Sequence, residues 1–142
     1  MQIPRAFFCV LLAGAGAAPP AAQTPAGCYH FDRPLGSSAS GALERDDSTF
    51  YTLELLPDST VSLPALQSSY WRAQYAHASR WRIQGDTLVV RISTGLVGWD
   101  LALVPRERRW VGTARYLSDA IGGPPIVVPV HAAAESCLRF RR

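Results

Sequence analysis

Apolar and polar residues alternate along residues 79–116, and turn residues divide this stretch into segments of strand length. Residues 81–84 and 87–93 flank the pair Gly85-Asp86, and a Gly-Asp pair between two alternating segments is typical of a two-residue β-hairpin. Because side chains alternate along a strand with period two, this pairing places the large apolar residues of both segments on one face.

The third segment, residues 98–104, continues the same alternation after a four-residue loop and places Trp99 opposite Ile92. The polar residues 105–108 are interpreted as a second four-residue loop, after which the returning strand places Ala114 opposite Trp99. A slip of one residue would turn every apolar side chain outward, so the agreement of successive hairpins on one buried face supports this alignment.

The opposite face of the predicted hairpins is polar and charged. It carries Arg80, Arg82, Arg91, Asp100, Arg109, Thr113 and Arg115. In the alignment above, Asp100 lies opposite Arg91 on one side and opposite Thr113 on the other. We interpret this as an exposed cross-strand ion pair worth about 0.2–1 kcal/mol.

The remainder of the chain supplies further strands. They are expected at residues 28–31, 50–56, 60–65 and 126–131. About eight short strands joined mainly by hairpins predict an all-β domain, as a small antiparallel up-and-down barrel or, as the alternative, a compact β-sandwich. Residues 66–77 read as either a turn of helix or an irregular lid. An eight-stranded barrel is filled by its side chains or holds one small ligand.

The first 22 residues have the layout of a secretory signal peptide. A basic start at Arg5 precedes a short apolar run over residues 6–18, and Pro19 to Ala22 supply small residues for cleavage. Residues 23–142 then form a single barrel domain of roughly 120 residues. No later segment approaches the roughly 20 apolar residues of a transmembrane helix. The sequence therefore predicts a secreted or periplasmic protein without a transmembrane segment.

The cysteines divide at the predicted cleavage point. Cys9 leaves with the signal peptide, whereas Cys28 and Cys137 remain near opposite ends of the domain. An oxidising compartment favours a disulfide between these two, which would tie the first strand to the end of the chain. The alternative is a lipid anchor on Cys28, because small residues precede it as they precede acylated cysteines.

Two short features resemble the calycin barrels, the group that contains lipocalins and avidins. Gly27-Cys28-Tyr29 stands at the first strand, where lipocalins carry Gly-x-Trp, and Arg139 lies near the end, where they carry a closing arginine. The resemblance implies an eight-stranded up-and-down barrel. The overall pattern is closer still to that of secreted bacterial proteins without an assigned function, so it implies no activity.

Charge and candidate chemistry exclude several function classes. The formal net charge is +3, or +2 once Arg5 is removed, which is too low for a nucleic-acid-binding surface. His30, His77 and His131 stand apart from one another and from other ligands, so we expect no metal and no cofactor. No set of serine, histidine and aspartate has catalytic spacing, so the chain is not expected to be an enzyme, and an uncharacterised enzyme is kept only as an alternative to a binding role.

Two binding hypotheses remain. The first places a small apolar or aromatic ligand among the inner-face aromatic residues, which favour such molecules. These residues are Tyr51, Trp81, Trp99, Trp110 and Tyr116. The second is a protein-protein interaction or inhibitor module that binds an envelope protein through a lid or loop rich in hot-spot residue types. That loop contains Tyr70, Trp71, Arg72 and Tyr75. A cavity inside the barrel would favour the first hypothesis, and a packed interior the second.

Overall fold

The structure is a computed structural model that describes residues 25–36, 48–118 and 124–140. Eight strands and two short helical segments make up these ranges. The strands are β1 (Gly27–Leu35), β2 (Phe50–Leu55), β3 (Val61–Ser62), β4 (Arg80–Gln84), β5 (Thr87–Ser93), β6 (Val97–Arg106), β7 (Arg109–Ser118) and β8 (Val127–Glu135). The helical segments are α1 (Ser69–Ala78) and the 3₁₀ turn η1 (Cys137–Phe140). The predicted signal peptide lies outside the described residues.

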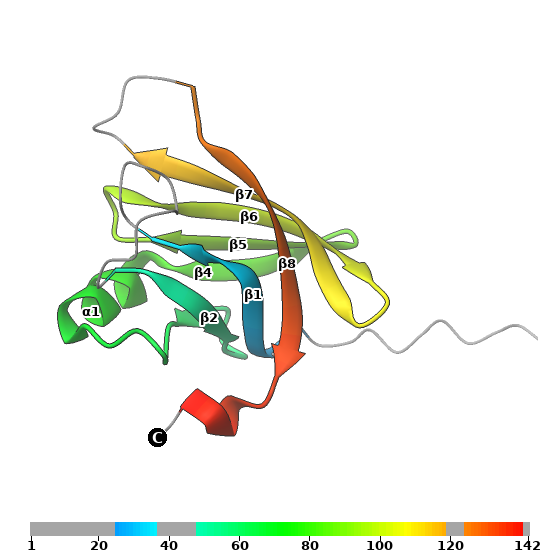
Figure 1. The fold of residues 1–142 in the computed structure, drawn as a ribbon, viewed down its shortest axis with the longest axis horizontal. Coiled ribbons are helices and arrows are strands. Elements are labelled where there is room, and N and C mark those ends of the chain that lie inside the picture. Colours follow the sequence, from blue (N-terminus) through cyan, green and yellow to red (C-terminus); the bar gives the residue numbers. More distant parts are fainter. Residues whose placement is uncertain (1–24, 37–47, 119–123, 141–142) are drawn as a thin grey trace, which may run out of the picture.

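The strands form a nearly closed antiparallel barrel (Figure 1). Their order is β3-β2-β1-β8-β7-β6-β5-β4, so consecutive strands pair except β3 and β4, which end the order, and β1 pairs with β8. The two outer strands meet through a bridge between Thr60 and Arg80 and through the Trp81 N–H, which donates to the Ser59 carbonyl at 2.9 Å. The predicted all-β up-and-down barrel is confirmed, and this architecture is consistent with a calycin-like barrel.

The alignment of β4, β5 and β6 agrees with the sequence prediction. Gln84 pairs with Thr87 across a turn in which Gly85 has a φ of 65°, a left-handed conformation that glycine adopts without steric cost. Trp99 pairs with Ile92, as the loop after β5 predicted. The buried residues of β5 and β6 therefore form one face of the barrel interior, whereas in β4 Trp81 is half-buried and Ile83, expected on the inner face, is exposed.

The predicted alignment of β6 with β7 is wrong by two residues. The turn consists of two residues rather than four, because Arg106 pairs with Arg109 and Glu107 adopts a left-handed φ of 54°. Trp99 consequently lies opposite Tyr116 instead of Ala114. A shift of two residues leaves every side chain on its predicted face, which is why alternation alone could not detect it.

The same correction applies to the charged outer face. Asp100 lies opposite Arg115, and Thr113 lies opposite Ala102. A close backbone approach accompanies this alignment, since a Cβ added at Gly112 would lie 1.9 Å from the Ala102 carbonyl oxygen. Glycine is therefore the residue that fits at this point of β7.

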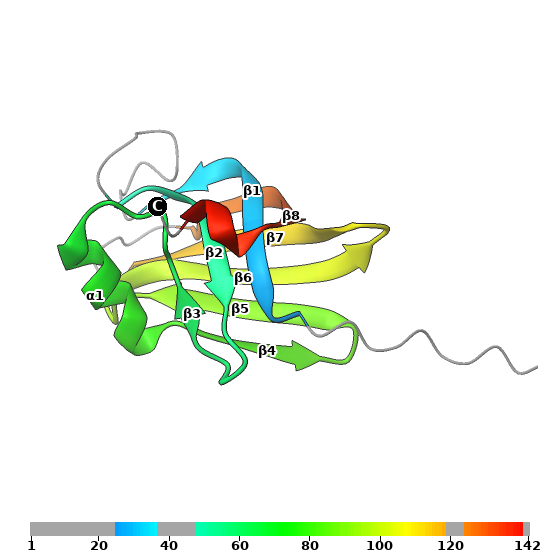
Figure 2. The same cartoon turned by 90° about the horizontal axis from the view of Figure 1, so that it is seen from below.

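Helix α1 covers one end of the barrel, and the tip of the β6–β7 hairpin lies at the other (Figure 2). The side chain of Ser68 accepts a hydrogen bond from the Trp71 N–H at 3.3 Å and so caps the first turn. On the inner side of the helix, Tyr75 is buried and packs edge-on against Phe50, with ring centroids 5.8 Å apart. Of the two interpretations of residues 66–77, the helix is correct. No helix among the described residues is long and apolar enough to cross a membrane.

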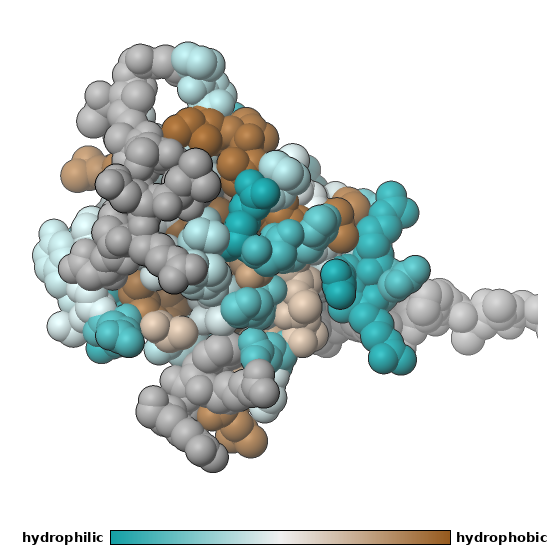
Figure 3. Space-filling view, in the orientation of Figure 1, coloured by the Kyte–Doolittle hydropathy of each residue, from teal (hydrophilic) through white to brown (hydrophobic). Residues whose placement is uncertain are grey.

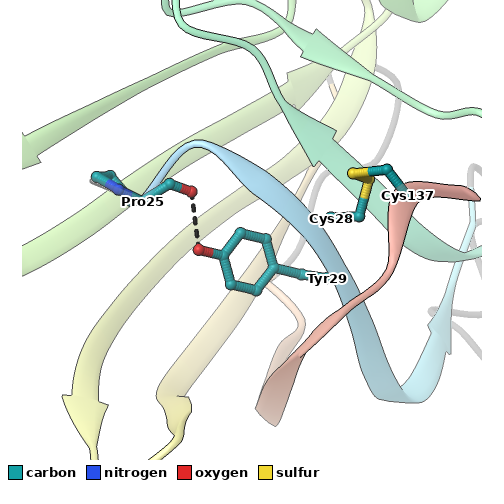
Figure 4. Close-up of a disulfide and its surroundings, with 4 residues drawn as sticks. All are labelled: Pro25, Cys28, Tyr29 and Cys137. Atoms are coloured by element: carbon teal, nitrogen blue, oxygen red, sulfur yellow. Dashed lines mark hydrogen bonds between the residues drawn. A yellow bond between two sulfur atoms is a disulfide. The ribbon is translucent and has the colours of Figure 1, made fainter. Parts of the chain in front are cut away.

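A disulfide between Cys28 and Cys137 joins β1 to η1, as the sequence predicted (Figure 4). It closes a loop with a sequence separation of 109 residues, and a loop of this length stabilises a fold by about 4.7 kcal/mol in the chain-entropy model. Beside it, the Tyr29 hydroxyl donates to the Pro25 carbonyl at 2.8 Å. Disulfides persist mainly in oxidising, extracytoplasmic compartments. A disulfide and a lipid on the same Cys28 sulfur exclude each other.

Candidate functional site

Two of the five predicted ligand-binding aromatics lie in the barrel interior. Trp99 is 0 % exposed, and its ring lies 5.1 Å from that of Tyr116, which is also buried. The indole N–H of Trp99 donates to the Gly36 carbonyl at 2.8 Å. The polar group of this indole is therefore already occupied by the protein itself, and its faces are covered by neighbouring side chains.

The interior between β1, β2, β5, β6 and β8 is tightly packed. The space there has a volume of about 10 Å³, about enough for one water molecule. It is lined by Tyr29, Phe31, Leu53, Leu55, Leu88, Val90, Leu103 and Ala132. Small-molecule sites usually have volumes of about 300–1,000 Å³. In this conformation the space among these eight residues is too small for such a ligand.

The other three aromatics lie at the margins of the barrel. The half-buried Trp81 donates its indole N–H to the Leu56 carbonyl at 2.8 Å, which holds β4 against the β2–β3 turn. The half-buried Trp110 contacts Tyr29: burial raises the pKa of the Tyr29 hydroxyl, and a hydrogen bond with the Trp110 side chain opposes this shift. The indole of each of these two tryptophans is thus engaged in a contact with another strand or turn of the barrel.

The placement of Tyr51 differs from the expected inner face. Its ring stacks on that of His30 with centroids 6.1 Å apart, and the His30 side chain is half exposed. An irregularity in the β1–β2 pairing turns Phe50 into the core at this point. The five aromatics therefore do not surround one common space.

The predicted partner loop is the helix α1, and it presents only part of the expected surface. Tyr70 is 63 % exposed and stacks edge-on against the half-buried Trp71. Arg72 is exposed, and its guanidinium donates to the carbonyls of Leu66 and Gln67. Because Tyr75 is buried, Tyr70 and Arg72 are the members of this set that reach solvent most fully.

The outer face of β4 to β7 contains a groove of about 890 Å³ that the sequence did not predict. Two cross-strand rows of residues form it. The first row is Arg80, Arg91, Asp100, Arg115 and Val127, and the second includes Arg82, Val89, Ala102 and Thr113. The arginines occupy outward-facing positions that alternate with inward-facing ones along each strand, and this pattern is the sequence signal of a basic outer face.

Asp100 fixes two arginines of this groove. Its carboxylate accepts two hydrogen bonds from Arg91, at 2.8 and 2.9 Å, and lies 3.5 Å from a guanidinium nitrogen of Arg115. The hydrogen bond with Arg91 lowers the pKa of the Asp100 carboxyl, against a smaller opposing effect of burial. The predicted Arg91–Asp100 pair is confirmed, and Arg115 replaces Thr113 as the partner on the other side.

Two other clusters of polar side chains are candidates for catalytic or metal-binding sites, and neither has the required groups among the described residues. His131 contacts Asp32, with the ring Nδ1 2.8 Å from a carboxylate oxygen. Burial opposes ionisation of Asp32, but hydrogen bonds with His131 outweigh it and lower the pKa of this carboxyl. Cys28, Glu54 and Cys137 place ligand atoms within 4.8 Å of one another, but both sulfurs are held in the disulfide. A disulfide sulfur is not the thiolate that a metal ion requires.

No family model, no curated protein and no solved structure matches this chain. The inference of function therefore rests on the filled interior, the exposed residues of α1 and the arginine groove on the outer face.

Proposed function

We propose that this protein is an exported binding protein that acts through its outer surface, as a protein-protein interaction or inhibitor module. The observation that supports this proposal is the packed core of the described barrel, where the space among eight core side chains is about 10 Å³, far below the volume of a usual ligand site. Binding must then occur on the outside of the barrel, where the groove and the exposed part of α1 lie.

Export is part of the proposal. The layout of residues 1–22 supports a secretory signal peptide, and the Cys28–Cys137 disulfide supports an oxidising destination outside the cytoplasm. We propose a secreted or periplasmic location and a distant relationship to the calycin barrels, in which the ligand space has been filled by side chains. The eight-stranded meander and Gly27-Cys28-Tyr29 support that relationship.

A rigid barrel suits recognition through its surface. The disulfide and the continuous ladder from β3 to β4 restrict backbone motion, so surface side chains are held in place before a partner arrives. Such preorganisation reduces the entropy lost on binding. Arginine and tyrosine are the residue types that most often dominate binding energy at protein interfaces, and both are exposed on this barrel.

The first test asks whether the interior takes up small molecules. The mature protein is titrated with 8-anilinonaphthalene-1-sulfonate, palmitate and retinol while the intrinsic tryptophan fluorescence is recorded. We expect no saturable response. Saturable binding with one molecule per barrel, abolished when Tyr116 is replaced by Trp to reduce the interior space further, would overturn the proposal.

The second test looks for a protein partner at the surface. A photo-crosslinking amino acid is placed at Tyr70 on α1 or at Thr113 in the groove, and at Asp86 in the β4–β5 turn as the matched exposed control. The proposal expects crosslinks to one polypeptide of the same compartment from the α1 or groove position but not from the control. Absence of crosslinks from all three positions in the producing cells would contradict it.

A further inference from the structure

The groove on the outer face of β4 to β7 carries an excess of positive charge. Four arginines and one aspartate line it, which leaves a formal charge of +3. Arg80 lies directly opposite Arg91, and like charges in this position destabilise a sheet. The single carboxylate, Asp100, is engaged by Arg91 and Arg115. An anion bound at Arg80 and Arg82 would relieve this repulsion.

Part of the groove is already ordered for anion binding. The paired hydrogen bonds between Arg91 and Asp100 fix the plane of the Arg91 guanidinium, and the contact with Arg115 restrains a second one. Guanidinium groups match carboxylates through two parallel hydrogen bonds. Because Arg91 and Arg115 are already held in the free protein, these two side chains lose less conformational entropy when a ligand binds.

The remainder of the groove is apolar. Val89 and Ala102 lie in the row beside the charged one, and Val127 ends the charged row as the direct partner of Arg115. Val127 is 52 % exposed, although it is a large hydrophobic residue. A ligand that covers the whole groove therefore needs apolar as well as anionic groups. Acidic polypeptides supply both, whereas sulfated polysaccharides and inorganic anions supply no apolar side chain.

The length of the groove fits an extended polypeptide. From Arg80 on β4 to Val127 on β8 it crosses four strand spacings, or about 19 Å, which equals the length of about six residues of extended chain. In an extended chain, side chains at alternate positions point in one direction. Acidic residues at every second position can thus face Arg80 and Arg82 at one end of the groove and Arg115 at the other.

We propose that this groove binds an extended, acidic segment of a partner polypeptide. The arginines Arg80, Arg82, Arg91 and Arg115 bind its carboxylates, and Val89, Ala102 and Val127 contact its apolar side chains. The proposal rests on the proposed function, because it requires that the protein binds through its outer surface. It adds the chemical class of the partner and the face that recognises it.

The probe for this proposal is a synthetic peptide of about eight residues, with Glu at alternate positions and Val near one end, carrying a fluorescent label. Its affinity for the full mature protein is measured by fluorescence anisotropy at low and at physiological salt. The groove variant is Arg80→Gln with Arg82→Gln. The matched control is Arg106→Gln with Arg108→Gln, two exposed residues at the β6–β7 hairpin tip that do not line the groove. The surface of this tip is hydrophilic (Figure 3).

Both double variants remove two exposed positive charges, so a merely electrostatic attraction to the whole protein would weaken equally in both. We expect the groove variant to raise the Kd at least tenfold and the hairpin variant to raise it less than twofold. Equal weakening by the two variants, or no binding of the peptide to the native protein, would overturn the proposal. Binding of dextran sulfate through the groove without binding of the peptide would also overturn it.

A second variant tests the shape of the groove without changing its charge. Thr113→Trp places a large side chain inside the groove. Thr113 is an exposed strand residue, and tryptophan is well tolerated in strands. Peptide binding should fall at least tenfold while the circular dichroism spectrum and the Tm stay unchanged; binding at native affinity would contradict the groove. Failure of the peptide tests together with crosslinks from Tyr70 would reject this proposal alone, whereas a ligand inside the barrel would reject the proposed function itself.

Discussion

Replacement of Trp99 by alanine removes the largest fully buried side chain of the barrel. Trp→Ala substitutions in protein cores cost about 3–5 kcal/mol, because apolar contacts are lost and a cavity remains. Trp99 lies between its cross-strand partners Ile92 and Tyr116, both held in ladders, so the surroundings cannot collapse into the space. The lost hydrogen bond to the Gly36 carbonyl adds about 1 kcal/mol. We therefore expect the free energy of unfolding to fall by about 4–6 kcal/mol.

This loss is a large fraction of the 5–15 kcal/mol that stabilises a typical domain. Equilibrium unfolding in urea, followed by far-ultraviolet circular dichroism with the disulfide intact, measures it without relying on tryptophan fluorescence. With a slope of about 2 kcal/mol per M urea, the midpoint should fall by about 2–3 M.

Two variants serve as controls for this measurement. Trp99→Phe keeps most of the packing but loses the hydrogen bond, so its midpoint should lie between those of the native protein and Trp99→Ala. Leu96→Ala changes an exposed side chain and should alter stability by less than about 0.5 kcal/mol. A change below about 1 kcal/mol for Trp99→Ala would refute the inward placement of this residue and, with it, the filled interior.

Further predictions concern the covalent link, the sheet alignment and the charged outer face. Non-reducing peptide mass analysis should find Cys28 and Cys137 in one linked pair; two free thiols would contradict the disulfide. Gly112→Ala should destabilise the barrel by more than 1 kcal/mol, because the new Cβ meets a backbone carbonyl, and an unchanged urea midpoint would refute the β6–β7 alignment. The pKa of Asp100 is lower in the folded protein than in the unfolded chain, where it is about 3.9. The ion pairs of Asp100 therefore stabilise the fold above this pH, and their contribution is lost as the pH falls through the folded pKa. The native protein and Asp100→Asn are compared by thermal unfolding at pH 7 and pH 2. The free energy of unfolding of the native protein should be higher by less than about 1 kcal/mol at pH 7, and the two values should converge at pH 2. A difference that stays the same at both pH values would show that the ion pairs of Asp100 do not cause it.

Sequence alternation was sufficient for the architecture. Most strands of this nearly closed meander pair with their neighbours in the chain, so local patterns and short turns determine most of the pairing. The turn at Gly85 could be predicted because glycine adopts a left-handed conformation at no cost, and it set the alignment of β4 with β5. The disulfide could be predicted as well, since only Cys28 and Cys137 remained after the expected cleavage.

Tertiary structure decided the features that alternation leaves open. A two-residue turn at Glu107 and a four-residue loop give the same faces, so the alternation does not distinguish the two alignments, which differ in strand pairing and in the left-handed backbone at Glu107. Phe50 points into the interior and Tyr51 does not, because the β1–β2 pairing is irregular at this point. No pattern in the sequence indicates this irregularity.

The candidate site depended on tertiary structure even more strongly. Whether aromatic residues fill a barrel or surround a cavity is a matter of volume, and volume is fixed only when side chains from all strands meet. The arginines of β4, β5 and β7 lie between residues 80 and 115, and they line one groove because strand pairing places them in two adjacent cross-strand rows. The sequence determined which residues face outward, and the pairing of the strands determined that they form a common surface.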